Sequence, residues 1–177
     1  MITNFEEILK KTKNLNLNNY SKTRNYLNGS VTKLSPYVSR GMISTRFIFE
    51  QIIGAGKPIK QYEKFIQELA WRDYWQLVWK HKDINQDLKR QQEEVNNHYI
   101  PKNIIEAQTK IEAIDYSIKK LYDEGYVHNH VRMYIASIIC NIANCHWKNP
   151  AKWFYYNLID ADWGSNALSW QWVCGTN

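Results

Sequence analysis

Apolar residues recur with helical rather than alternating spacing along almost the whole chain, and this periodicity limits the choice of fold more than any other feature. Glycine and proline cluster at segment boundaries near residues 28–30, 54–58, 101 and 150. The sequence therefore predicts an all-α fold. The expected helices cover residues 4–12, 44–54, 60–81, 84–96, 103–124, 129–145 and 150–158. Ser44 is expected to cap the second helix and Gly125 to end the fifth.

The 177 residues show no repeat, low-complexity tract or flexible linker, so one domain over residues 1–177 is expected. The net charge of +6 favours a polyanionic partner such as nucleic acid or an anionic membrane surface. The three cysteines show no disulfide or zinc spacing, which favours a reducing, cytoplasmic setting. No apolar run approaches the roughly 18 residues that a membrane span needs. The closing segment SWQWVCGTN has core-like character, which predicts a chain cut short.

The polar stretch between Tyr20 and Ser44 is predicted to be an ordered loop. It contains Thr32, Lys33, Leu34 and Ser35, which offer hydroxyl groups, a positive charge and backbone N–H groups before a helical segment. Such a group of donors suits an anion such as a diphosphate. The alternative interpretation is an ordinary helix N-cap.

In the predicted helix 60–81, the spacing places Glu68, Arg72 and Trp75 on one face, with Trp71 beside Arg72. One interpretation is an exposed Glu68–Arg72 ion pair with both indoles in the core. The other is a cavity wall, where the charged pair hydrogen-bonds a planar ligand and an indole stacks on it.

Two later segments carry further polar groups. Asn129, Arg132 and Met133 share a helix face that suits the approach of a polar ligand, whereas the nearby histidines lack metal-ligand spacing, so no metal site is expected. Asp160 and Asp162 could bind a divalent cation or form an acid–base pair. Because few other oxygen ligands and no histidine accompany them, recognition of a heterocycle fits better.

The motifs YSxxR, TKLSPY, ELAWRDYW, HNxxRM and DxDxxxNxxxWQW follow one another, and in this order they resemble the helical FAD-binding domain of DNA photolyases and cryptochromes over about residues 20–175. The resemblance implies a helical bundle that lacks the family's N-terminal α/β antenna domain and its C-terminal end. It also implies a deoxyribodipyrimidine photolyase-like lyase, which uses FAD and light to repair cyclobutane pyrimidine dimers by electron transfer. The alternatives are a cryptochrome-like blue-light flavoprotein without repair activity and a basic nucleic-acid-binding domain without a cofactor.

The resemblance also implies roles for single residues. The family positions that hold the diphosphate and ribityl chain of FAD are matched here by Tyr20, Arg24, Thr32, Lys33, Leu34 and Ser35. Contacts to the flavin match Arg72, Asn129, Arg132, Asp160, Asp162 and Asn166, with Arg132 expected to pair with Asp160. Catalytic roles match Glu68, Trp71, Asn129, Met133 and Asn166, of which Glu68 and Trp71 meet the dimer.

Trp170 and Trp147 match the inner and middle members of the family's electron-transfer chain. No tryptophan matches the outer member, so Tyr99 could substitute or photoreduction could be slow. Relatives that repair the (6-4) photoproduct carry His at the positions of Asn129 and Met133, and plant-type cryptochromes carry Asp at Asn166. The implied partner is therefore UV-damaged DNA that contains cyclobutane dimers, with an antenna domain or protein supplied separately; the oligomeric state stays open.

Overall fold

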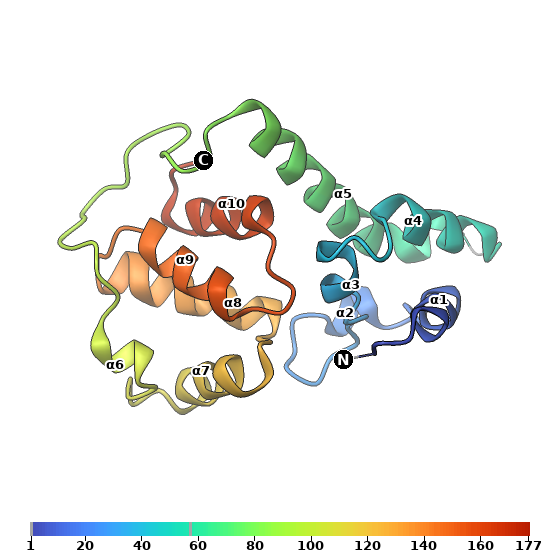
Figure 1. Cartoon of the computed structure of the whole chain (residues 1–177), viewed down its shortest axis with the longest axis horizontal. Helices are drawn as coiled ribbons and strands as arrows, with labels where there is room; N and C mark the ends of the chain where they lie inside the picture. Colours follow the sequence, from blue (N-terminus) through green and yellow to red (C-terminus); the bar gives the residue numbers. More distant parts are fainter. Residues whose placement is uncertain (1, 57) are drawn as a thin grey trace. The chain divides into compact units, whose positions relative to one another are not determined.

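The computed structural model describes residues 2–56 and 58–177, and the regular elements within them are helices (Figure 1). They are α1 (Phe5–Lys13), α2 (Tyr20–Thr23), α3 (Ser35–Ser39), α4 (Thr45–Gly54), α5 (Ile59–His81), α6 (Lys102–Ile105), α7 (Glu112–Glu124), α8 (Asn129–Ser137), the π-helix η1 (Ile138–Ile142), α9 (Lys148–Asn157) and α10 (Trp163–Cys174). The chain separates into two compact units, Met1–Tyr74 and Trp75–Asn177, with the boundary inside α5. The predicted all-α class is confirmed.

The core of the first unit forms where α1 packs on α4. Its fully buried side chains include Ile8 from α1 and Ile48 from α4. Both helices begin at a side-chain cap, because Asn4 accepts the backbone N–H of Glu6 at 2.9 Å and Ser44 accepts that of Phe47 at 2.9 Å. The predicted cap at Ser44 is therefore confirmed.

The core of the second unit lies where α10 packs on α8 and α9 (Figure 1). Trp147, Phe154 and Leu168 are fully buried in it. Gly125 ends α7 in a left-handed conformation, with a φ of 63°, as predicted. A Cβ atom at this position would lie 2.6 Å from Cγ2 of Ile159, so any other residue would have to displace the Ile159 side chain.

The predicted helix over residues 84–96 is wrong, because this segment is an irregular loop of turns and bends. Its backbone groups bond to distant parts of the chain instead of to each other. The N–H of Lys89 donates to the carbonyl of Thr176 at 2.8 Å, and the Gln171 amide donates to the carbonyls of Ile84 and Gln86. These tertiary hydrogen bonds take the place of some of the backbone bonds that a helix would make.

Two other predicted helices are interrupted. The predicted helix over 103–124 consists of α6 and α7, because Ala107 and Lys110 between them have positive φ values. Asp115 supports the restart, since its carboxylate accepts the hydroxyl and backbone N–H of Thr109 at 2.6 and 2.8 Å. The predicted helix over 129–145 ends earlier, at Ile142, and its last turn is the π-helix η1.

The helix α10 is absent from the sequence prediction. It buries Gly164, Leu168, Trp170 and Gln171, which lie around the helix rather than along one stripe, so its sequence lacks the amphipathic period. The predicted loop between Tyr20 and Ser44 likewise contains the short helices α2 and α3. Within the described residues, every helix is too short or too polar to cross a membrane.

Candidate functional site

In the first unit, the residues at the end of α2 and in the middle of α5 form an ion pair. Nη1 of Arg24 lies 2.9 Å from Oε1 of Glu68, and Nζ of Lys64 lies 3.6 Å from the same oxygen. The Arg24 and Glu68 side chains are 21% and 30% exposed. The sequence assigned these two residues to separate roles, and neither interpretation of the helix predicted this pair. The fold thus holds the Glu68 carboxylate between two cations.

Trp71 lies on α5 one turn beyond Glu68. Its side chain is 44% exposed, and its ring meets that of Tyr74 edge to face at 5.7 Å between centroids. The interpretation that placed Trp71 in the core is therefore wrong. An exposed indole face is a suitable surface for stacking a planar group.

The predicted anion-binding loop lies before α3. Leu34 anchors it in the core, being only 2% exposed, while its N–H bonds the Thr32 hydroxyl at 3.4 Å. Lys33 between them is exposed and has a φ of 52°, a backbone conformation that few non-glycine residues adopt. Burial and the nearby charge of Lys33 lower the pKa of Lys11. Two cations therefore lie near each other at this loop, an arrangement that favours an anion.

Tyr20 and Ser35 occupy the first positions of α2 and α3. The Tyr20 ring packs edge to face on Phe65 at 5.0 Å, which fixes α2 against α5. Both residues of the predicted site therefore lie at helix starts in the same unit as Arg24 and Lys33.

In the second unit, the predicted pair between Arg132 and Asp160 is present. Nη2 of Arg132 donates to both carboxylate oxygens, at 3.0 and 2.9 Å, and its Nε donates to the carbonyl of Val127 at 2.7 Å. The Asp160 side chain is only 4% exposed. The guanidinium also lies 5.6 Å from the ring centroid of Tyr126, whose pKa burial raises.

Asp162 and Asn166 are fixed at the start of α10. One oxygen of Asp162 caps the helix by accepting the N–H of Ser165 at 2.7 Å, and both of its oxygens accept the Gln76 amide at 2.8 Å. The Asn166 amide donates to the carbonyl of Ala151 at 2.7 Å. Gln76 is a site residue that the sequence did not predict, since no local pattern links positions 86 residues apart.

Asn129 and Met133 lie one turn apart on α8, the helix that also carries Arg132. Asn129 is exposed and Met133 is partly buried. The alternative of a divalent cation at the two aspartates has no further support, since no group of three His, Cys, Asp or Glu side chains in the described part of the chain could hold a metal ion.

The two predicted electron-transfer tryptophans belong to the same buried core cluster. Trp147 and Trp170 are 0% and 3% exposed, and the Trp170 ring meets Phe154 edge to face at 5.6 Å. Tyr99, by contrast, is 82% exposed. Both indoles are therefore shielded from water, whereas the tyrosine is not.

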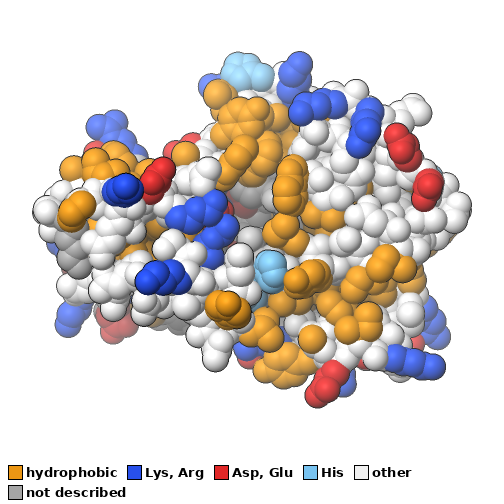
Figure 2. All heavy atoms as spheres, turned by 180° about the vertical axis from the view of Figure 1, so that it is seen from behind, with side chains coloured by type: hydrophobic (Ala, Val, Ile, Leu, Met, Phe, Trp, Pro, Cys, Tyr) orange, Lys and Arg blue, Asp and Glu red, His pale blue; other side chains and the backbone are white. Residues whose placement is uncertain are grey.

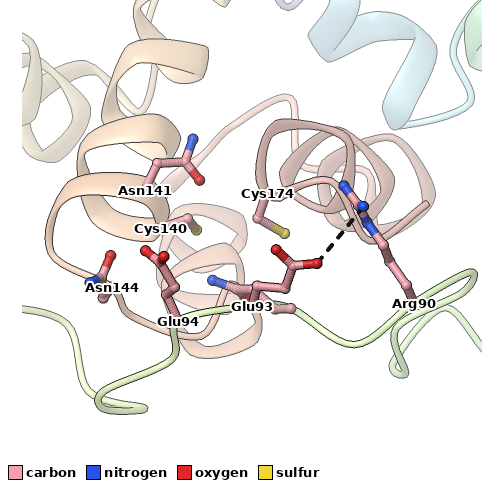
Figure 3. Close-up of a pocket in the computed structure, with 8 residues that line it drawn as sticks. Arg90, Glu93, Glu94, Cys140, Asn141, Asn144 and Cys174 are labelled. Atoms are coloured by element: carbon pink, nitrogen blue, oxygen red, sulfur yellow. Dashed lines mark ion pairs between the residues drawn. The ribbon is translucent and has the colours of Figure 1, made fainter.

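The second unit also has a polar pocket of about 260 Å³ that contains none of the predicted site residues (Figure 3). Cys140 from η1 and Cys174 from α10 reach it, with Arg90 and Glu93 at its rim (Figure 3). The interaction between the two thiols lowers the pKa of Cys174 and, together with burial, raises that of Cys140. The pocket therefore holds one more acidic and one less acidic thiol.

The polar groups of each unit suit a different kind of ligand group. In the first unit, the Arg24 guanidinium, the Lys33 ammonium group and the Thr32 hydroxyl are groups that can bind a phosphate. In the second unit, the Asp160 carboxylate and the Asn166 amide are groups that can hydrogen-bond a heterocycle. Figure 2 shows hydrophobic side chains gathered in patches on this face, with Lys and Arg and also Asp and Glu side chains around them.

Comparisons with known proteins identify the family of this chain. The family model for the "FAD binding domain of DNA photolyase" matches residues 65–177. The deoxyribodipyrimidine photo-lyase of Alkalihalophilus pseudofirmus is 30% identical over 89% of this chain and 34% of its own length. A cryptochrome DASH of Danio rerio is 30% identical over 88% of this chain and 32% of its own. The chain thus spans about a third of the length of these curated relatives.

Solved structures share the fold. A bacterial class III photolyase from Agrobacterium tumefaciens matches with a TM-score of 0.81 at 24% identity, over 99% of this chain and 38% of that one. A Synechocystis cryptochrome matches with a TM-score of 0.86 at 23% identity, over 99% and 40%. These two structures show that the chain shares their fold.

Proposed function

The chain belongs to the family of FAD-binding domains of DNA photolyases, and we propose from this membership that it uses FAD for the light-driven repair of cyclobutane pyrimidine dimers in DNA. The observation that carries the proposal is the ion pair between Arg132 and Asp160, formed with the Asp160 side chain only 4% exposed. A buried ion pair contributes little net stability, so a role in positioning a ligand accounts for it better.

FAD supplies the absorption of light and the electron, as cofactors generally supply the difficult chemistry. The residues of this chain bind and orient it. Arg24, Lys33 and the hydroxyl groups beside them would hold the diphosphate, as cations and N–H or O–H donors do in other anion sites. Arg132 and Asp160 would fix the polar edge of the ring, with Asn166 nearby on α10.

The exposed indole of Trp71 would be the stacking wall for a dimer that has left the duplex. A damaged pair stacks and pairs poorly, which makes its extrusion less costly than that of an intact base. Glu68 would accept a hydrogen bond from the lesion, and its ion pair with Arg24 at 2.9 Å would hold the carboxylate in place. Lys and Arg side chains would contact the flanking phosphates.

The first test is the visible absorption spectrum of the purified protein, with release of the bound flavin after denaturation. The second is blue-light repair of an oligonucleotide that contains a dimer, in the wild type and in Trp71→Ala. The matched control is Trp79→Ala, since Trp79 lies on the same helix and is similarly exposed at 42%. We expect Trp71→Ala to lose light-dependent repair with its FAD content unchanged and the control to keep both.

Repair that survives in Trp71→Ala would remove this residue from the lesion site, and a protein that cannot be reconstituted with FAD would refute the whole proposal. The second candidate function is a blue-light flavoprotein without repair activity, which the similarity to proteins named cryptochrome DASH favours. If the flavin bound to the wild-type protein responds to light but the dimers stay intact, this second function is supported.

A further inference from the structure

The buried indole of Trp147 donates its only hydrogen bond to a carboxylate. Trp147 is 0% exposed, and its Nε1 lies 2.6 Å from Oδ1 of Asp87. Indole nitrogen is a donor only, so this single bond uses its whole capacity. Asp87 lies in the loop before α6, which the sequence predicted to be helical and to which it assigned no function.

The carboxylate of Asp87 is held rigidly against the indole. Its second oxygen accepts the backbone N–H of Gln92 at 2.9 Å, and the Gln92 side-chain oxygen accepts the backbone N–H of Trp147 at 2.9 Å. The loop and the tryptophan are thus joined at two points. The Asp87 side chain is 14% exposed and thus reaches water, whereas the Trp147 side chain is fully buried.

The neighbouring histidine makes no hydrogen bond to the Asp87 oxygen that faces the indole. Nε2 of His146 lies 3.8 Å from Oδ1 of Asp87, beyond hydrogen-bond distance. Burial lowers the pKa of His146, and the charge of Asp87 opposes this effect only in part. The lowered pKa favours the neutral imidazole at neutral pH. The Asp87 carboxylate is therefore the group that accepts the indole N–H, at 2.6 Å.

An indole N–H becomes far more acidic when the ring loses an electron, because the ring then carries a positive charge. We propose that Asp87 accepts the indole proton of Trp147 when this tryptophan is oxidised, so that the electron hole ends as a neutral radical on Trp147. The inference rests on the proposed function, in which Trp147 passes an electron to the oxidised Trp170. A neutral radical on Trp147 would make an outer tryptophan or Tyr99 unnecessary as the final site of the electron hole.

The step balances as follows in electrons and protons. One electron leaves Trp147 for Trp170, the N–H bond of Trp147 breaks, and its proton forms an O–H bond with Oδ1 of Asp87. The products are a neutral indolyl radical and a neutral carboxylic acid. An external thiol later returns one electron to the indole, and the Asp87 proton returns to its nitrogen.

The test compares the wild type with Asp87→Asn by transient absorption after a flash, in protein loaded with FAD. The variant keeps the shape of the side chain and an oxygen that can accept the indole N–H, but an amide is a much weaker base than a carboxylate. The control is Glu93→Gln, which changes a carboxylate of the same loop that is 81% exposed. A Trp147→Phe variant assigns the radical to this position.

We expect the wild type and the control to show the spectrum of a neutral tryptophan radical, whose formation slows in heavy water. Asp87→Asn should show a radical cation that recombines about tenfold faster or more, since each pKa unit of proton affinity changes an equilibrium tenfold. A neutral radical of equal yield and lifetime in Asp87→Asn would overturn the inference. A purely structural hydrogen bond would leave the protonation state of the radical unchanged.

A second experiment separates this inference from the proposed electron path. If no Trp147 radical forms in the protein loaded with FAD, the proposed electron transfer from Trp147 to Trp170 is refuted. Pulse radiolysis, in which azide radicals oxidise tryptophan, then tests the proton transfer in the protein without FAD. The Trp147→Phe difference again isolates the signal. A neutral Trp147 radical in the wild type and a radical cation in Asp87→Asn would support Asp87 as the proton acceptor. A radical cation in both proteins, or no Trp147 radical in either, would overturn the inference. The N–H resonance of Trp147 in nuclear magnetic resonance spectra checks that the variant is folded.

Discussion

Asp160→Asn removes the charge from the most buried ion pair of the proposed flavin site. Its side chain is 4% exposed and receives two hydrogen bonds from Arg132. Removing one partner of a buried pair typically costs about 3–5 kcal/mol, because the other charge is left uncompensated. Arg132 keeps 21% of its side chain exposed and its bond to Val127, so solvent compensates it in part, and we expect a loss of about 2–3 kcal/mol.

Thermal unfolding followed by circular dichroism, in protein without FAD, measures this loss. For a chain of this length it corresponds to a fall in Tm of about 4–12 °C. The matched control is Glu124→Gln in the same unit, whose ion pair with Lys120 spans 3.4 Å and whose side chain is 56% exposed. The control should cost less than about 0.5 kcal/mol. Equal shifts in the two variants would refute the reasoning that burial gives the Arg132–Asp160 pair its effect.

Three further predictions concern single residues. Gly125→Ala should destabilise the protein by about 1–3 kcal/mol more than Gly41→Ala in urea unfolding, because both have positive φ but only the first meets a side chain. Hydrogen bonds from Thr109 lower the pKa of Asp115, so the contribution of Asp115 to folding stability is complete above the ordinary pKa of 3.8 and is lost as pH falls through the lowered pKa. The difference in unfolding free energy between the wild type and Asp115→Asn should therefore shrink as pH falls through that range. A difference that does not depend on pH would contradict this prediction. Iodoacetamide should alkylate Cys174 before Cys140, as judged by peptide mass spectrometry, because the thiolate is the nucleophile and the pKa shifts are opposite; preferential labelling of Cys140 would be the contrary result.

Part of the candidate site was accessible from the sequence. The order of motifs placed Arg132 and Asp160 in one site, and the structure pairs them at 2.9 Å. The ion pair between Arg24 and Glu68 was not predicted, because the two residues lie on separate helices and their approach depends on how α2 packs against α5. The same reason applies to Asp87 and Trp147, whose hydrogen bond joins positions 60 residues apart.

The sequence by itself determined the helices that begin and end by local interactions. Ser44 caps the N-terminus of α4 and Gly125 terminates α7, through contacts within a few residues that any copy of these segments would make. The regular spacing of apolar residues likewise predicted α5 to within one residue.

Only the tertiary structure decided the loop over residues 84–96 and the helix α10. The loop has the composition of a helix, but its backbone groups bond the C-terminal segment, as in the 2.8 Å bond between Lys89 and Thr176. In α10, buried residues lie around the helix, so its sequence shows no single apolar face. Local propensities are worth less than about 1 kcal/mol per residue, so burial and hydrogen bonds between distant segments outweigh them where the two disagree.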